Sequence, residues 1–186
     1  MHCVSKNSVR KTAPPIPNPQ SLIDTHCHLE MTEFDEDRDK VIQRARDAGI
    51  EAVITVGSDL KGNIGSLRLS EKYDFIYSSV GIHPHDAKDF TEEVYQQIKK
   101  WAASSPKVVA IGETGLDYHY DNSPRGVQKE VFRKHLLLAK ELALPVIIHS
   151  REAKEDTLEI LGDSGINRGV LHCFSGDMDM AEKAME

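Results

Sequence analysis

The stretch Leu22-Ile23-Asp24-Thr25-His26-Cys27-His28-Leu29 decides which kind of α/β fold the sequence predicts. Its apolar and β-branched residues indicate a strand, and this strand ends in polar residues. A dinucleotide-binding sheet would carry a glycine-rich turn at this point, and the sequence has no glycine there. In a TIM-type barrel, side chains that can bind ligands collect at the carboxyl ends of the strands. The stretch therefore favours a barrel.

The rest of the chain repeats this pattern of a short apolar run followed by a segment with helical spacing. The runs begin between 23 and 37 residues apart, which leaves room for a helix after each strand. We therefore expect an α/β fold, namely a TIM (β/α)8-type barrel that is incomplete and contains about six βα units. The expected strands lie in Leu22–Leu29, Glu51–Gly57, Ile76–Pro84, Val108–Asp117, Pro145–Arg151 and Arg168–Gly176.

Residues 1–20 are expected to form a tail outside the barrel. The segment from residue 13 to residue 19 is rich in proline, which neither continues a helix nor donates a hydrogen bond to a sheet. Residues 21–186 then form a single barrel domain. A whole TIM barrel typically needs ~250 residues, so six units correspond to roughly three-quarters of one.

Composition excludes several classes of protein. Hydrophobic residues make up 39% of the chain and charged residues 28%, with both signs mixed, which excludes a disordered or fibrous protein. No apolar run approaches the ~18 residues of a membrane span, and the amino terminus lacks the pattern of a secretory signal. The three cysteines are too few for a disulfide framework and suit a reducing compartment. We expect a cytoplasmic protein without membrane contact.

The charge balance bears on nucleic-acid binding. The net charge is −7, which argues against a broad basic surface for nucleic acid. Metal ions can nevertheless reverse the charge of a site locally. An acidic chain therefore remains compatible with a metal-dependent enzyme that acts on phosphates.

Four histidines and one glutamate fall at the ends of the expected strands. His26 and His28 are two residues apart, so their side chains point to one face of a strand and can hold one metal ion. Taken singly, each histidine is better explained as an ordinary core or loop residue. A barrel brings these strand ends together, however, and chance is a poor explanation for all five positions. We expect metal ligands at His26, His28, Glu113, His149 and His172.

Glu113 has the properties of a bridging ligand. Glycines on both sides allow backbone or substrate to approach closely, and its two carboxylate oxygens can each face a different ion. Two ions ~3.5–4 Å apart are a common arrangement for hydrolysing phosphate esters. Arg151 lies two residues after His149 and can grip a phosphate with two hydrogen bonds.

Three further polar residues have more open interpretations. His83 is preferred as a residue that binds a substrate phosphate or orients the site, although an ordinary loop histidine is nearly as good an explanation. Asp24 lies two residues before His26, so both side chains point to the same face of the strand, and Asp24 can orient a metal-ligating histidine through a hydrogen bond. Asp117 either supports the site or caps the next segment.

Five motifs resemble those of the TatD family of metal-dependent deoxyribonucleases. They follow one another in the order of the family, from about Leu22 to the end of the sequence. The resemblance implies a TIM-barrel hydrolase of the amidohydrolase-like type that cuts phosphodiester bonds in DNA with two divalent metal ions. The motifs are Ile23–Leu29, Gly81–His85, Ile111–Asp117, His149–Arg151 and His172–Gly176.

The resemblance also implies roles for single residues. His26 and His28 would bind one ion and His149 and His172 the other, with Glu113 bridging them. The residues expected at the reacting phosphate, besides Glu113, are His83 and Arg151. An imidazole-rich site suits Zn²⁺ or Mn²⁺ better than Mg²⁺, although a carboxylate bridge also permits Mg²⁺.

The sequence departs from the family pattern at its end, and this departure leaves two alternatives. Family members continue for two further βα units with an aspartate motif, and nothing up to Glu186 corresponds to it. The chain would then be an inactive fragment or isoform. The other alternative is an amidohydrolase relative acting on small esters or amides, whose usual mark is a carboxylated lysine; Lys107 lies at the start of the fourth strand. The sequence does not predict an oligomeric state.

Overall fold

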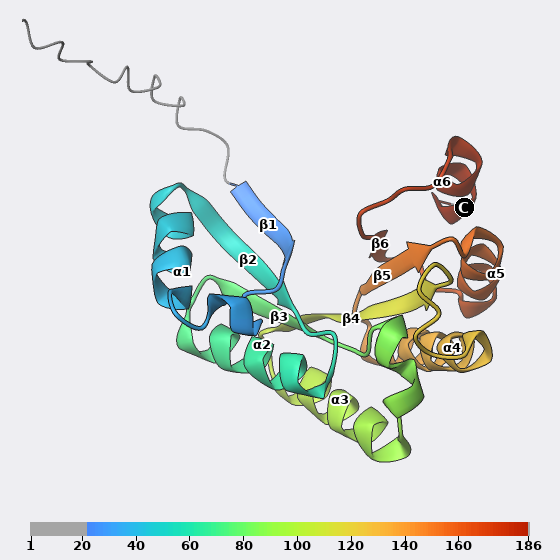
Figure 1. The fold of residues 1–186 in the computed structure, drawn as a ribbon, viewed down its shortest axis with the longest axis horizontal. Helices are drawn as coiled ribbons and strands as arrows, with labels where there is room; N and C mark the ends of the chain where they lie inside the picture. The colour runs from blue at the N-terminus through green and yellow to red at the C-terminus, as the bar shows by residue number, and fades with distance from the viewer. Residues whose placement is uncertain (1–21, 186) are drawn as a thin grey trace, which may run out of the picture.

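The computed structural model describes residues 22–185, so the expected tail of residues 1–20 lies outside the described residues. Six parallel strands form one curved sheet in the order of the sequence, and the helices cover its outer side (Figure 1). This architecture confirms the TIM-type α/β fold with six βα units. The strands are β1 (Leu22–Cys27), β2 (Ile50–Val56), β3 (Ile76–Val80), β4 (Val108–Asp117), β5 (Val146–Arg151) and β6 (Gly169–Leu171).

One helix or more follows each strand. Two short 3₁₀ helices, η1 and η2, precede α1 and α3, and the other helices begin a few residues after their strands. Thr91 caps α3 as its side chain accepts a hydrogen bond from the Val94 backbone at 3.3 Å. The helices are η1 (Thr32–Phe34), α1 (Arg38–Asp47), α2 (Leu60–Lys72), η2 (Pro84–Asp89), α3 (Glu92–Ser104), α4 (Arg125–Leu142), α5 (Lys154–Ser164) and α6 (Met178–Met185).

The main hydrophobic core lies between the sheet and the helices that follow β3, β4 and β5. Ile98 of α3 and Phe132 of α4 are fully buried against β4 residues such as Ile111. These helical side chains belong to the apolar stripes on one face of α3 and α4. The core therefore supports β4 and β5, which carry Glu113, Asp117, His149 and Arg151 of the site described below.

Two expected strands are shorter in the structure. β3 ends at Val80 instead of continuing to Pro84, because Pro84 begins η2 and His83 caps that helix. β6 ends at Leu171 instead of Gly176, and Cys173 takes a positive φ of 46°, which is incompatible with a strand. In both cases the residues that leave the strand form a loop at the carboxyl end of the sheet.

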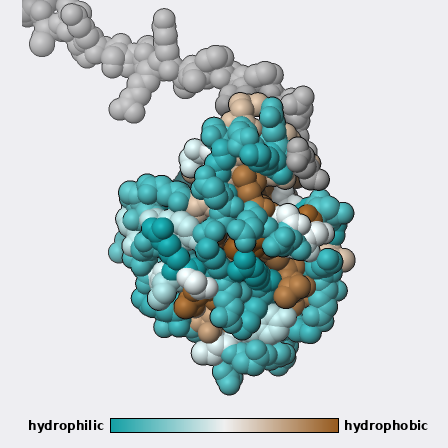
Figure 2. Space-filling model, turned by 90° about the vertical axis from the view of Figure 1, so that its right-hand side faces the viewer, coloured by the Kyte–Doolittle hydropathy of each residue, from teal (hydrophilic) through white to brown (hydrophobic). Residues whose placement is uncertain are grey.

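Two edges of the sheet have one neighbouring strand each in the described part of the chain. β1 pairs with β2, and β6 pairs with β5. Viewed from the side of β6 and α6, the surface is mostly hydrophilic with apolar patches near its middle (Figure 2). Among residues 22–185, no helix is long and apolar enough to cross a membrane.

Candidate metal centre

Five histidines surround Glu113 at the carboxyl end of the sheet. They come from four places: the end of β1, the loop after β3, the end of β5 and the loop after β6. Two groups of possible ligand atoms share the Glu113 carboxylate, and within each group the atoms lie within 4.8 Å of one another. The groups are His26, Glu113 and His172, and His83, Glu113 and His149. The structure thus brings together all five residues that the sequence predicts as ligands, with His28 beside the first group.

Glu113 lies at the middle of the site with only 4% of its surface exposed. Its Oε2 atom is 3.5 Å from His26 Nε2 and its Oε1 atom is 3.1 Å from His149 Nδ1. The two oxygens therefore face two separate sets of histidines, as a bridging carboxylate requires. Gly115 explains the close approach of the strands here, because it has φ +141° and a Cβ would collide with the His149 carbonyl oxygen.

In its neutral form, His28 presents a free nitrogen lone pair to this centre. Its Nδ1 atom is 2.9 Å from the Val56 carbonyl oxygen, which only accepts, so Nδ1 carries the proton. The unprotonated Nε2 atom then faces His26 Nε2 at 3.3 Å. Two zinc ligands at tetrahedral angles lie about 3.4 Å apart, so this pair of nitrogens has the spacing of two metal ligands.

His26 and His172 come from opposite edges of the described sheet and meet at the same point. Their rings are stacked with centroids 3.3 Å apart and an angle of 9° between the planes. His26 Nδ1 is buried and has no hydrogen-bond partner within residues 22–185. Burial and the neighbouring His26 lower the pKa of His172, so its ring is neutral at pH 7 and can also bind a cation.

His149 is oriented by Asp117. Its Nε2 atom is 3.0 Å from Asp117 Oδ2 and its Nδ1 atom is 3.1 Å from Glu113 Oε1, so the ring lies between two carboxylates and donates to both when it is protonated. This pattern, in which a carboxylate lies behind a histidine, is typical of metal-ligating histidines. Burial opposes protonation of His149, but the Glu113 and Asp117 carboxylates outweigh it and raise its pKa. A divalent cation would replace that proton.

Asp117 is itself fixed by its surroundings and is completely buried. Its Oδ1 atom accepts hydrogen bonds from the backbones of His119 and Tyr120, at 3.0 and 2.9 Å. Its Oδ2 atom also accepts from His85 Nε2 at 3.0 Å. Burial raises the pKa of this carboxyl, but the hydrogen bonds outweigh burial and hold the pKa of Asp117 below its usual value. Of the two interpretations of Asp117 from the sequence, support of the site matches these contacts, although it also orders the turn after β4.

His83 differs from the other histidines in the site. Its Nδ1 atom accepts the His85 backbone N–H at 3.2 Å, so the neutral ring carries its proton on Nε2. Burial lowers the pKa of His83 to about 3, which keeps the ring neutral. The Nε2–H group points toward Glu113 at 3.9 Å. His83 is therefore arranged to donate a hydrogen bond into the site, and the lone pair that a metal would need is already used.

Glu113 remains ionised in this environment. Burial raises the pKa of a carboxyl, but hydrogen bonds from His149 and His26 and the nearby His83 reverse the shift and hold the pKa of Glu113 well below its usual value. A permanently charged carboxylate among imidazoles is the donor set that a divalent transition metal prefers. The residues present thus fit a metal centre.

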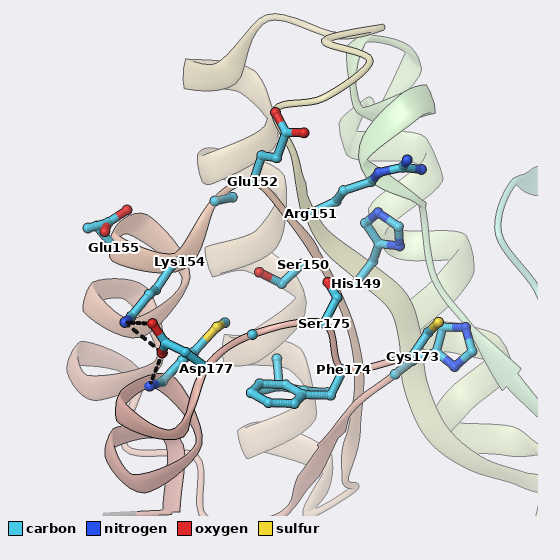
Figure 3. A pocket seen from close by; sticks show the side chains of 15 residues that line it. His149, Ser150, Arg151, Glu152, Lys154, Glu155, Cys173, Phe174, Ser175 and Asp177 are labelled. Atoms are coloured by element: carbon cyan, nitrogen blue, oxygen red, sulfur yellow. Dashed lines mark hydrogen bonds and ion pairs between the residues drawn. The ribbon is translucent and has the colours of Figure 1, made fainter.

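Arg151 lies on the rim of the site. Its side chain extends past His149 on the wall of a cleft of about 910 Å³, which also contains His172 and Phe174 (Figure 3). Within residues 22–185, no carboxylate lies within ion-pairing distance of its guanidinium, in contrast to Lys154, which pairs with Asp177. Arg151 thus lies on the rim of the cleft that His149 also lines, and its contact with a phosphate stays a prediction.

Other expectations need adjustment. Asp24 accepts the His26 backbone N–H at 3.1 Å and so shapes the strand end instead of orienting an imidazole. Lys107 lies at the amino end of β4 over the Tyr77 ring, 3.4 Å from the Ile76 carbonyl oxygen. It is therefore at the opposite end of the sheet from Glu113, and a carboxylated Lys107 is not a ligand of this centre.

Two supporting residues were not predicted from the sequence. Glu30 has an almost buried side chain, accepts a hydrogen bond from Thr55 Oγ1 at 2.6 Å and lies 3.3 Å from His28 Nδ1. That contact is the main reason why the pKa of His28 is raised. His135 of α4 accepts the Ile82 backbone N–H at 3.2 Å and so holds the loop that carries His83. The spacing of two residues between His28 and Glu30 was a sequence signal that could have identified Glu30. His135 lies in a helix and had no such signal.

Comparison with known proteins agrees with this geometry. A family model described as TatD related DNase matches residues 23–186. The Bacillus subtilis protein YabD, named an uncharacterized metal-dependent hydrolase, is 47% identical over 89% of this chain and 65% of its own length. A protein of Erwinia tasmaniensis named 3'-5' ssDNA/RNA exonuclease TatD is 37% identical over 88% of this chain and 64% of its own.

A solved structure shares the fold. The crystal structure of YJJV, a TatD homologue from Escherichia coli K12, superposes with a TM-score of 0.82 at 32% identity and covers 88% of this chain and 64% of that one. The chain spans about two thirds of the length of the curated relatives it matches. By its sequence, its fold and the five motifs around Glu113, the chain belongs to the TatD related DNase family.

Proposed function

We propose that this protein is a divalent-metal-dependent hydrolase that cleaves phosphodiester bonds in DNA by a two-metal mechanism. The observation that carries the proposal is the Glu113 carboxylate, whose two oxygens face His26 on one side and His149 on the other at 3.5 and 3.1 Å. Further support comes from the Erwinia tasmaniensis relative, which is named for exonuclease action on single-stranded DNA and RNA.

The chain offers a donor set for two ions. His26 and His28 would hold one ion and His149 the other, while Glu113 would bridge them. His172 groups with His26 and Glu113, so its assignment to the second ion rests only on family resemblance. Metal ions at such a site activate water as a nucleophile near neutral pH and stabilise charge on phosphoryl oxygens. Imidazole nitrogens dominate the set, which favours Zn²⁺ or Mn²⁺ over Mg²⁺.

The other residues of the site would position the phosphodiester. His83 Nε2–H would donate a hydrogen bond to a phosphate oxygen, because its ring is neutral and its Nδ1 atom is already bonded. The unpaired Arg151 guanidinium would neutralise a second oxygen from the rim. Glu30 and Asp117 would keep the imidazoles of His28 and His149 in the tautomers that leave their lone pairs free.

The test is to replace the bridging carboxylate. Glu113→Gln in the full chain should lower metal content and abolish cleavage of a single-stranded oligonucleotide, while Glu155→Gln, on the exposed start of α5, should change neither. Metal content measured by mass spectrometry accompanies the cleavage assay. Normal cleavage by Glu113→Gln with normal metal content would refute the proposal.

Two further outcomes separate the alternatives. Hydrolysis of small esters or amides without cleavage of DNA would support the amidohydrolase alternative. Binding of two equivalents of metal without turnover of any substrate would instead support the inactive-fragment alternative. Each result contradicts the proposed deoxyribonuclease activity of this chain.

A further inference from the structure

An exposed tyrosine beside the centre has no role in the metal site. Tyr120 follows β4 by three residues, and 55% of its surface is exposed to solvent. The Arg151 guanidinium lies over its ring, with 4.9 Å between Cζ and the ring centroid. Large aromatic side chains that face solvent next to an arginine are typical platforms for nucleobases in proteins that bind single strands.

Tyr120 is held in place despite its exposure. Its backbone N–H donates to the buried Asp117 carboxylate at 2.9 Å. Two imidazoles meet its ring nearly at right angles: His85 at 5.4 Å and His119 at 4.7 Å between centroids. His119 is anchored in turn by Glu152 at 2.8 Å. A ring fixed in this way loses little conformational entropy when a ligand stacks on it.

The position of Tyr120 relates it to the metal centre. Asp117 Oδ2 lies 3.0 Å from both His85 and His149, so a single buried carboxylate joins the Tyr120 turn to an expected metal ligand. Arg151 belongs to the same strand as His149, two residues further along. Arg151 and Tyr120 therefore lie beside the metal centre, where a strand of nucleic acid with one phosphate at that centre can reach them.

Charge and chemistry identify the occupant. The Arg151 guanidinium has no carboxylate partner in the described range and can bind a phosphate, while the Tyr120 ring offers an apolar face. A free phosphate would need only the arginine and would leave the exposed Tyr120 ring without a partner. A nucleotide unit, with an anionic phosphate and a stacking base, matches both groups.

We propose that Tyr120 and Arg151 form a nucleotide subsite of this hydrolase, in which a base of a single-stranded nucleic acid stacks on Tyr120 and the adjoining phosphate contacts Arg151. The proposal rests on the proposed function and adds where the nucleic-acid strand lies on the protein. Since every base has a stacking face, the subsite selects unpaired strands over duplexes without reading sequence.

The experiment compares binding of a fluorescein-labelled oligothymidylate with that of the same strand carrying abasic residues near its 3′ end, in Ca²⁺, by fluorescence anisotropy. Tyr120→Ala should weaken binding of the normal strand about 5- to 100-fold and leave binding of the abasic strand unchanged. Tyr120→Phe keeps the ring and should bind as the wild type does. Arg151→Ala should weaken both strands and reduce the salt dependence, whereas Tyr120→Ala should not alter that dependence.

Two control variants sharpen the comparison. Tyr77→Ala removes a tyrosine that also carries a cation, Lys107, but at the opposite end of the sheet, and should leave binding unchanged. Phe174→Ala removes the exposed aromatic on the other side of the cleft. Thermal unfolding of each variant reports whether it folds.

The subsite proposal is refuted if Tyr120→Ala binds both strands like the wild type. It is also refuted if Phe174→Ala, and not Tyr120→Ala, weakens binding of the normal strand while leaving binding of the abasic strand unchanged. In either case, metal-dependent cleavage by the wild type would leave the proposed function intact. Absence of cleavage together with normal base-dependent binding would overturn the proposed function and keep the subsite.

Discussion

Asp117 connects three histidines of this chain through hydrogen bonds to one side chain. Its Oδ2 atom accepts from His85 and His149, and its Oδ1 atom accepts from the His119 backbone. A metal-ligating histidine that donates to a carboxylate is both oriented and made more basic. Loss of the Asp117 carboxylate should therefore weaken metal binding and not only destabilise the fold.

Asp117→Asn should therefore weaken metal binding by about 10- to 100-fold, measured by calorimetry with Zn²⁺ or Mn²⁺. The amide can still accept the two backbone hydrogen bonds, but its NH₂ group would then face two imidazole N–H groups. Asp121→Asn is the matched control, because that carboxylate is exposed and pairs with Arg125. Equal affinities of the two variants would show that the Asp117–His149 contact does not support the metal.

His135 gives the fold a dependence on pH that its helix position did not predict. Burial lowers its pKa to about 4, whereas an unfolded histidine titrates near 6.5. Between these values the unfolded chain binds a proton that the folded chain does not, so the free energy of unfolding falls as the pH decreases from 6.5 to 4. The full effect is about 3 kcal/mol.

Urea unfolding at pH 7 and pH 4.5 should reveal this effect as a difference between the wild type and His135→Gln. The wild type should lose more stability than the variant over this interval, since glutamine does not titrate. Other histidines contribute equally to both proteins and cancel in the comparison. A pH dependence identical in both proteins would mean that His135 is not buried in its neutral form.

At the scale of elements, β4 and β5 approach each other closely because glycine occupies key positions. Gly115 has φ +141°, and a Cβ there would collide with the His149 backbone. Gly115→Ala should lower the free energy of unfolding by about 3 kcal/mol or more, through backbone strain and the displaced strand. Because His149 would move, metal affinity should fall as well.

Gly162→Ala is the opposite case and the control. Gly162 lies in α5, and a methyl group on its Cα would have no other atom within 4 Å, so alanine should stabilise the helix by about 0.5–1 kcal/mol. Urea unfolding curves measure both changes. A Gly115→Ala variant as stable as the wild type would contradict the close packing of β4 against β5.

The elements also show how far the sequence could predict this protein. Strand β4 appears at the expected residues, Val108–Asp117, because the apolar run at its start, residues 108–111, marks a buried strand. The five ligand candidates were predictable because parallel strands bring their carboxyl ends to one edge. The end of β6 could not be predicted, because no local sequence signal indicates the positive φ of Cys173.

The supporting residues were harder to predict for a physical reason. Glu30 is held by Thr55, and His135 holds the Ile82 backbone; each of these partners is more than 20 residues away along the chain. A spacing rule identifies residues that share one strand or helix, whereas these contacts join different elements. The preference for His83 as a residue that binds a substrate phosphate or orients the site was reasoned from the sequence, but its tautomer depends on the turn of η2.

At the scale of the whole molecule, the candidate metal centre joins the two edges of the described sheet. β1 contributes His26 and the loop after β6 contributes His172, and their stacked rings meet although four strands separate them along the sheet. A ligand that binds these residues only in the folded chain stabilises it by RT ln(1 + [L]/Kd). Metal binding should therefore stabilise the entire sheet, including both edges.

At a metal concentration about 100 times the Kd, the expected stabilisation is about 2.7 kcal/mol, or roughly 5–10 °C in Tm for a chain of this size. Differential scanning fluorimetry with Zn²⁺, Mn²⁺ and Mg²⁺ measures the shift, and hydrogen exchange should slow in β1 and β6 as well as in β4. Glu113→Gln should remove most of the shift because it breaks the bridge between both groups of histidines, whereas Glu155→Gln should retain it. A wild-type Tm that does not respond to any of the three metals would exclude a metal centre that joins the edges of the sheet. A shift with protection in β4 and β5 alone would instead confine the ion to Glu113 and His149.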